Sequence, residues 1–259
     1  MSDANSLGGA ARHLRQYIER LQAAGVEWVP AADPSAVLPV VARPASLNLS
    51  APVVEDPTPV SELRDRRVEL AVLAEDVKQC VACSELASTR TQTVFGVGPM
   101  NPELCFVGEA PGADEDRRGE PFVGAAGQLL NRIIVACGMK REEVYICNIL
   151  RCRPPGNRPP KAEEAANCRS FLERTLELVA PKFICCLGGS AANYLLKVNS
   201  SIGKMRGRLH DYNGIPVICT YHPSYLLRSE SVEPKRQVWE DMKALMARMG
   251  RPVPEAKKE

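Results

Sequence analysis

Four short apolar runs constrain the fold of this chain more than any other feature of its sequence. They begin at residue 103 and read ELCFVGEA, EVYICNIL, KFICCLGG and IPVICTYHP. Continuous apolar runs of this length are typical of strands that are covered on both faces. Helical patterns separate and follow them, near residues 124–137, 161–179, 190–198 and 235–249. This alternation predicts an α/β fold, a three-layer sandwich around a mostly parallel four-stranded sheet.

The start of the chain lacks this alternation. Apolar residues recur every three or four positions between residues 10 and 24, which predicts an amphipathic helix within residues 1–27. Such a helix either packs on the main domain or docks on a partner protein. Seven prolines in thirty residues then predict an extended, semi-rigid linker over residues 28–66, because proline has no backbone donor. One folded domain is expected over residues 67–259.

Charge and hydropathy narrow the function classes only slightly. No apolar run reaches the roughly 18 residues that a membrane span requires. The N-terminal sequence MSDANSLGGA has neither the basic start nor the apolar stretch of a secretory signal. We therefore expect a cytoplasmic monomer with no membrane partner. The net charge is +2, with −2 in residues 1–66 and +4 in the remainder, a bias that is compatible with a small nucleic-acid footprint.

The ten cysteines fall into two groups, and structural disulfides are rare in a reducing cytosol. Six lie inside apolar runs, where a free cysteine behaves as a small buried hydrophobe: Cys105, Cys137, Cys147, Cys185, Cys186 and Cys219. The other four have polar, Pro-rich or charged neighbours: Cys80, Cys83, Cys152 and Cys168. A C-x2-C turn lets two thiolates reach one metal centre, and the second pair completes four ligands. Zinc and a [4Fe–4S] cluster both accept four cysteines, so the spacing predicts a shared metal site but leaves the metal open.

The first apolar run continues into a glycine-rich and acidic segment, GEAPGADEDRRGEPFVG. Gly108 and Gly112 suit a tight turn in which the backbone approaches a ligand closely. The acidic residues 114–116 read on their own as a solvated loop. Phe122 either stacks on a flat base or packs in the core. These residues lie where ligands bind in open α/β folds, at the carboxyl end of a strand.

Two further polar residues follow other apolar runs. Asn148 offers a donor and an acceptor together, which suits the edge of a pyrimidine, or it caps a strand end. His222 begins the segment HPSYLLR and can donate a hydrogen bond to an oxygen that gains charge, or it is structural. Leu226 belongs to an apolar tip beside Arg228. That tip either fills the gap left by a flipped base or forms a short helix that buries its leucines.

Together and in this order, five motifs resemble the family 4 uracil-DNA glycosylases over residues 68–249. They are CVAC, GEAPGADED, PFVG, NILRCRPPGNRPP with a cysteine downstream, and HPSYLLR. The resemblance implies a [4Fe–4S] cluster on four ligands: Cys80, Cys83, Cys152 and Cys168. It implies a monofunctional DNA glycosylase that flips uracil out of single- or double-stranded DNA and hydrolyses its N-glycosidic bond. An abasic site would remain, as in base excision repair.

The resemblance also implies roles for single residues. Phe122 would stack on uracil, Asn148 would read its polar edge, and His222 would face the carbonyl that becomes negative. Glu109 would lie at the mouth of the site with its backbone near the base, and Leu226 would intercalate. The remaining substrate-binding residues would be Gly108, Ala110, Gly112 and Glu115, of which Glu115 would exclude the methyl group of thymine.

One departure from related enzymes concerns the mechanism. The best-known uracil-DNA glycosylases carry an aspartate where this chain has Ala110, so a direct general base is missing there. The segment RCRPPGNRPP also lacks the histidine-containing insertion of the covalent uracil-trapping relatives, which predicts turnover. Two alternatives remain: a non-catalytic iron–sulfur DNA-binding module associated with a polymerase, and a glycosylase that prefers another deaminated base.

Overall fold

The computed structural model describes residues 60–253. The N-terminal helix and most of the linker expected from the sequence lie outside these described residues. Helix α2 (Val60–Gln79) begins within the last residues of the expected linker. Of the described helices, none is both long enough and apolar enough to cross a membrane.

A five-stranded sheet forms the centre of the described domain, in the order β2-β1-β3-β5-β4. Its first four strands are parallel. They are β2 (Tyr145–Asn148), β1 (Leu104–Gly108), β3 (Phe183–Leu187) and β5 (Ile215–Thr220). These correspond to the four apolar runs, and the prediction of an α/β sandwich with a mostly parallel sheet is confirmed.

The fifth strand is the difference from the expected four. Strand β4 (Leu209–Tyr212) pairs antiparallel with β5 at the edge of the sheet. Asn213 and Gly214 connect the two strands, and both have positive φ, as a two-residue hairpin turn requires. Only the last residue of β4 is buried, so its sequence LHDY has no apolar run. Its short length and polar character suit an edge strand.

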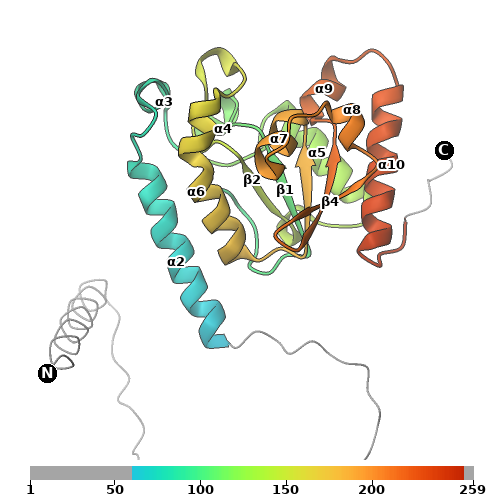
Figure 1. The fold of residues 1–259 in the computed structure, drawn as a ribbon, viewed down its shortest axis with the longest axis horizontal. Helices are drawn as coiled ribbons and strands as arrows, with labels where there is room; N and C mark the ends of the chain where they lie inside the picture. The colour runs from blue at the N-terminus through green and yellow to red at the C-terminus, as the bar shows by residue number, and fades with distance from the viewer. Residues whose placement is uncertain (1–59, 254–259) are drawn as a thin grey trace, which may run out of the picture. The chain divides into compact units, whose positions relative to one another are not determined.

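Helices cover both faces of the sheet and make it the middle of three layers (Figure 1). One face packs against α5 (Ala125–Ala136), α9 (Pro223–Arg228) and α10 (Glu233–Arg248). The other packs against α6 (Ala162–Val179), α7 (Gly189–Leu196) and α8 (Ile202–Met205). Each fully buried aliphatic side chain in these layers contributes about 1.5–3 kcal/mol relative to exposure.

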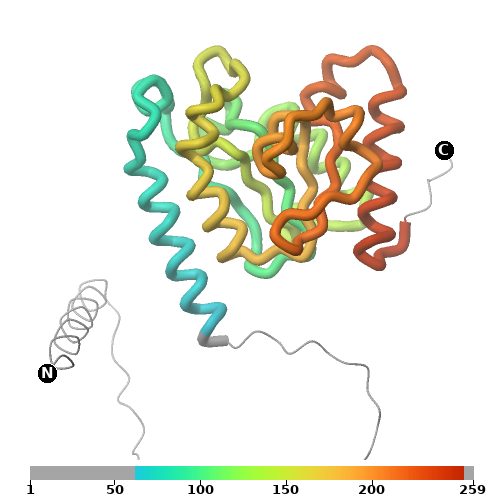
Figure 2. Tube along the Cα trace, in the orientation of Figure 1, coloured from blue at the N-terminus to red at the C-terminus, as the bar shows by residue number. Residues whose placement is uncertain are grey.

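The remaining helices lie at the margins of the sandwich. Helix α2 runs beside α6, although the two are far apart in the sequence (Figure 2). The short elements are α3 (Ser84–Thr89), α4 (Ala113–Arg118), η1 (Arg141–Glu143) and η2 (Pro155–Asn157). The six cysteines of the apolar runs are buried and free, as predicted for small core hydrophobes.

Candidate functional site

The carboxyl ends of β1 and β2 bring Gly108, Asn148 and Phe122 together. Gly108 and Asn148 are register partners in the parallel pair. A Cβ atom on Gly108 would overlap Oδ1 of Asn148 and lie 2.6 Å from Cζ of Phe122. Only glycine fits this position, because both side chains lie directly against its Cα atom. The predicted reader of the polar edge and the predicted stacking residue therefore share one small site.

Asn148 is buried but incompletely bonded. The residue is 2% exposed, and its Oδ1 has no hydrogen-bond partner among the described residues. Leaving a buried acceptor without a donor costs about 1–3 kcal/mol. A ligand that brings an N–H group to Oδ1 would remove this penalty. The site therefore offers a buried acceptor beside the ring of Phe122, which is itself 5% exposed.

The backbone of Phe122 has a φ of 54°, a left-handed conformation that residues other than glycine rarely adopt. Glu115 stabilises the segment that follows it: its Oε1 accepts hydrogen bonds from the backbone N–H groups of Val123 and Gly124, both at 2.9 Å. The other oxygen accepts from the N–H of Gly112 at 3.1 Å. One carboxylate thus ties the turn after β1 to the segment that carries Phe122. The exclusion of thymine by Glu115 stays a prediction.

His222 faces the same site from the end of β5. It caps the N-terminus of α9, and its Nδ1 accepts a hydrogen bond from the backbone N–H of Ser224 at 3.1 Å. Its ring centroid lies 5.6 Å from that of Phe122. Burial of the ring, with the nearby charge of Arg228, lowers the pKa of His222 to about 4, and Glu115 opposes this shift. At neutral pH the ring is therefore neutral, with its proton on Nε2.

The turn between β1 and α4 is fixed by backbone bonds. The N–H groups of Ile149 and Leu150 donate to the carbonyls of Gly108 and Glu109, at 3.0 and 3.1 Å. Glu109 and Ala110 are half-buried. Ala110 packs against the apolar cluster that contains two of the polar-segment cysteines. The turn therefore connects the site at Gly108 to the predicted metal ligands.

The four polar-segment cysteines come from three parts of the chain. Cys152 and Cys168 are buried in one cluster with Leu86, and Cys83 packs against it. Burial raises the pKa of the Cys168 thiol to about 11, and the Cys152 and Cys83 thiols act in the same direction. Cys80 and Cys83 likewise raise the pKa of Cys152, although burial is the larger cause. Each of the four thiols thus lies within electrostatic reach of at least one other, and Cys152 interacts with all three.

The described residues include no group of three or more His, Cys, Asp or Glu side chains arranged around a single metal ion. A [4Fe–4S] cluster would be held by four cysteine thiolates. The donor set of four cysteines therefore suits such a cluster in its chemistry.

A buried cation, Arg151, lies beside these cysteines. Arg151 is 1% exposed and donates to the Phe95 carbonyl and, at 2.9 Å, to Oγ1 of Thr175. Its Nε has no hydrogen-bond partner, and no carboxylate of the described residues pairs with it. The Cys105 thiol and the Arg151 guanidinium both lower the pKa of the buried Cys147 thiol, so Arg151 also lies against a cysteine of the sheet.

An unpaired buried charge is strongly unfavourable. A backbone hydrogen bond from Arg151 and, to a smaller extent, its positive charge oppose the effect of burial and lower the pKa of Cys168. A metal–thiolate group on these cysteines would therefore add to the counter-charge of Arg151.

Comparison with known proteins identifies the family. The family model of the uracil DNA glycosylase superfamily matches residues 95–243, which include β1, β2, β3, β5 and the ends of these strands. The chain belongs to this superfamily. Within it, the chain is 45% identical to a type-4 uracil-DNA glycosylase of Thermotoga maritima over 175 residues, 67% of this chain and 91% of the relative.

Other type-4 uracil-DNA glycosylases agree. The relative from Archaeoglobus fulgidus is 42% identical over 60% of this chain and 81% of its own length. The relative from Saccharolobus solfataricus is 40% identical over 66% of this chain and 82% of its own length. The predicted resemblance to the type-4 family is confirmed.

One residue of this glycosylase family member does not lie where the sequence analysis expected it. Leu226 is 3% exposed and packs in the core between the sheet, α5 and α10. The expectation that it is exposed for intercalation is wrong in this structure. Its neighbours Tyr225 and Leu227 are 43% and 48% exposed. Helix α9 has only six residues, and its buried side consists of Pro223 and Leu226.

Asp116 also differs from the expectation, which was that residues 114–116 form a solvated loop. It is 4% exposed, and its carboxylate accepts hydrogen bonds from the N–H of Thr91, at 3.0 and 3.1 Å. The bond fixes α4 to the segment after α3. Asp114 alone behaves as a solvated acidic residue, paired with Arg117 at 2.5 Å. Three consecutive acidic residues thus have three different environments, and their spacing of one residue contains no signal that separates them.

Proposed function

We propose that this protein excises uracil from DNA and leaves an abasic site for base excision repair. The observation that carries the proposal is the unpaired, buried Oδ1 of Asn148 beside Phe122 and Gly108. Uracil offers a ring N–H between two carbonyl groups, so its edge matches an amide that needs a donor. The names of the type-4 relatives support the same substrate.

The substrate base has to leave the DNA stack before it reaches this site. Extrusion costs a few kcal/mol in a duplex and least in single strands or mismatches. Phe122 then stacks on the ring, and Asn148 accepts a hydrogen bond from its N–H group. Glu109 places its backbone beside the base, where the bonds to Ile149 and Leu150 hold the turn. Binding thus orients the base before the glycosidic bond breaks.

The chemistry then depends on charge. When the bond between the sugar C1′ and the base nitrogen breaks, its electron pair stays on uracil and the sugar becomes cationic. His222 donates its Nε2–H to the carbonyl oxygen that gains negative charge. A preorganised donor of this kind lowers the activation free energy by about 2.7–4 kcal/mol. Water adds to the sugar, and its released proton goes to solvent or to the departing base. Ala110 supplies no base for this water, so stabilising both charged fragments is the main contribution of the protein.

We further propose that Cys80, Cys83, Cys152 and Cys168 hold a [4Fe–4S] cluster. The donor set and the unpaired buried cation of Arg151 support it. The cluster would connect three segments of the chain, and its role would be structural. Because metal binding and folding are coupled, it would hold the loop over residues 151–161 near the DNA.

An excision assay tests the activity. Oligonucleotides that carry uracil, hypoxanthine or xanthine, in single strands and duplexes, are incubated with the full chain, and abasic sites are measured by alkaline cleavage. We expect release of uracil from both kinds of DNA. Release of hypoxanthine in its place would support the alternative of another deaminated base. Binding of uracil-containing DNA without any release would support a non-catalytic module.

A further inference from the structure

A guanidinium group joins the two halves of the four-cysteine set. Arg90 follows the end of α3, and its Nη1 donates to Sγ of Cys152 at 3.1 Å. Its Nη2 donates to the carbonyl of Cys80 at 2.8 Å and to that of Lys78 at 3.2 Å. One planar side chain thus contacts a cysteine of each pair. It bonds a sulfur on one side and the backbone of the C-x2-C turn on the other.

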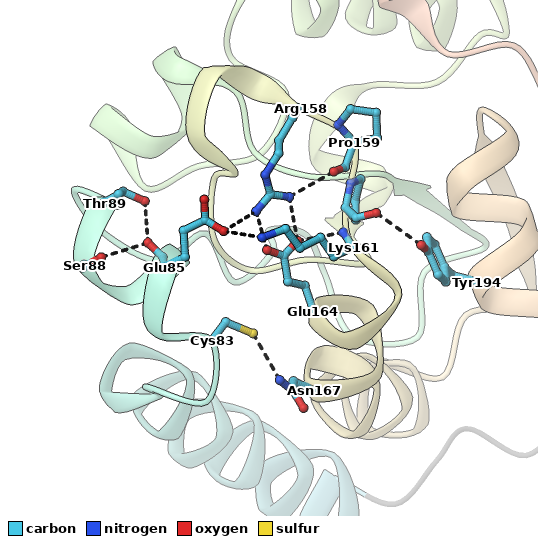
Figure 3. A network of polar contacts seen from close by, with 11 residues as sticks. Cys83, Glu85, Ser88, Thr89, Arg158, Pro159, Lys161, Glu164, Asn167 and Tyr194 are labelled. Carbon is cyan, nitrogen blue, oxygen red and sulfur yellow. Dashed lines mark hydrogen bonds and ion pairs between the residues drawn. The ribbon is translucent and has the colours of Figure 1, made fainter.

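Two other cations near these cysteines, Arg158 and Lys161, have carboxylate counter-charges (Figure 3). Arg158 pairs with Glu164 at 2.5 Å and with Glu85 at 2.9 Å, and Lys161 pairs with Glu85 at 2.6 Å. The group that approaches Cys83 is a neutral amide, Nδ2 of Asn167, at 3.4 Å. This network connects α3, the loop before α6 and the first turn of α6 without leaving a free charge.

Arg90 differs from these residues in its counter-charge. It is half-buried, and no carboxylate of the described part of the chain pairs with it. A guanidinium removed from water is stable when an anion replaces the lost solvation. The group that occupies this place is the sulfur of Cys152. The position of Arg90 therefore fits a thiolate ligand of a negatively charged cluster.

We propose that Arg90 is the counter-ion of the [4Fe–4S] cluster and raises its reduction potential; this inference rests on the cluster proposed above. The potential of such a cluster depends on net charge, on hydrogen bonds to its sulfurs and on exposure to solvent. One-electron reduction adds negative charge to the cluster. A cation bonded to a ligand sulfur stabilises the reduced state more than the oxidised state. The bonds to Lys78 and Cys80 hold the guanidinium in place for this role.

The test compares three variants of the full-length protein, purified anaerobically with its cluster. Arg90→Gln removes the charge, Arg90→Lys keeps the charge but loses the planar fork, and Arg153→Gln is the control. Arg153 follows Cys152 directly, but its Nε donates to Oδ1 of Asn157 at 2.7 Å and not to a sulfur. Reduction potentials are measured by a redox titration that is followed by EPR spectroscopy.

We expect Arg90→Gln to lower the equilibrium constant for reduction about tenfold, a shift of about 59 mV to more negative potential. Arg90→Lys should recover most of the shift, and Arg153→Gln should show a small part of it. Equal potentials for Arg90→Gln and wild type, or equal shifts for Arg90→Gln and Arg153→Gln, would contradict the inference.

Iron content separates this inference from the cluster proposal. Wild-type protein without iron and sulfide would overturn the cluster and, with it, the role of Arg90. If wild-type protein contains the cluster but substitution of Arg90 leaves its reduction potential unchanged, only the role of Arg90 is overturned. If Arg90→Gln retains no cluster, the reduction potential of Arg90→Lys, which keeps the charge but loses the planar fork, decides. A potential more negative than that of Arg153→Gln supports the counter-ion role, and a potential equal to that of Arg153→Gln contradicts it.

Discussion

The backbone N–H of Ser224 donates to Nδ1 of His222 over 3.1 Å, and this bond determines which ring nitrogen carries the proton. With the pKa of His222 lowered to about 4 by burial, the residue is a neutral donor through Nε2. A neutral ring stabilises a developing anion by a hydrogen bond and transfers no proton. The pH dependence of the excision rate tests whether His222 is neutral during the reaction.

We expect single-turnover excision to stay constant from neutral pH down to about pH 5 and to change only near the pKa of His222, where protonation of Nδ1 removes the bond from the N–H of Ser224 that orients the ring. A histidine with its usual pKa would titrate at about 6.5 and change the rate there. The rate is measured across this range with saturating enzyme. An inflection near pH 6.5 that disappears in His222→Gln would show that the ring is protonated in the range where we expect it to be neutral.

The same shift affects stability. The pKa of His222 is lower in the folded than in the unfolded protein, so the unfolded chain binds the proton more tightly. Stability therefore falls as the pH decreases from about 6.5 towards 4, by at most about 3 kcal/mol from this residue. Urea denaturation at several pH values should show a smaller fall in His222→Gln. An identical pH dependence in both proteins would contradict the assignment.

Asn148→Ala and His222→Ala are expected to lose about a hundredfold or more in single-turnover excision, because each removes a bond to the base or to its developing charge. DNA affinity should change little, since phosphate contacts supply most of it. Rapid-quench assays and fluorescence anisotropy measure the two quantities. Excision at the wild-type rate by either variant would remove that residue from the mechanism.

Glu115 is expected to affect stability and excision through its hydrogen bonds to three backbone N–H groups. Glu115→Ala leaves the N–H groups of Gly112, Val123 and Gly124 without their acceptor, at about 1–3 kcal/mol for each that stays buried. We expect a lower free energy of unfolding and at least a tenfold loss of excision. Glu115→Gln keeps one carbonyl acceptor and should lie between Ala and wild type. Asp114→Ala is the control, because exposed pairs such as its pair with Arg117 contribute under about 1 kcal/mol.

Leu226 and Leu227 are expected to separate stability from duplex binding. Leu226→Ala opens a cavity in the core and should destabilise the protein by about 2–5 kcal/mol. Its remaining folded fraction should excise from single strands and duplexes with equal losses. Leu227→Ala should leave stability within about 0.5 kcal/mol and weaken excision from duplexes selectively, because only a stacked base needs a wedge. The opposite pattern would restore the wedge role to Leu226.

Iron analysis tests the cysteine set. Anaerobically purified protein should contain about four iron and four sulfide per chain. Cys152→Ser and Cys168→Ser should lose the iron and much of the fold, because cluster binding and folding are coupled. Cys186→Ala changes a buried cysteine of the sheet and should keep the iron. Stoichiometric zinc in protein from iron-replete cells would overturn the cluster.

Residue type and order were sufficient to predict the parallel strands and the residues at their ends. Continuous apolar runs have one stable arrangement in a layered fold, and Gly108, Asn148, Phe122 and His222 follow from it. Strand β4 was missed because an edge strand needs no apolar run. Its Asn213–Gly214 turn was the available signal.

Other features depend on packing that no local pattern records. Tyr225, Leu226 and Leu227 are consecutive in α9, and the rotation of the helix against α5 and α10 decides that Leu226 is the buried one. Arg151 reads as one of several loop arginines, yet it is buried. Arg90 has no motif around it. Its importance arises only because the chain folds back and places it against Cys152.

The three bonds to Glu115 mean that the two sides of the site are joined before any nucleic acid arrives. A site assembled in advance cannot gain selectivity by closing more tightly on one lesion than on another. Differences between U·G, U·A and single-stranded uracil would then originate in how readily each base leaves its partner. The rate at which each uracil leaves the DNA stack, rather than a closing movement of the protein, would decide which lesions are repaired first.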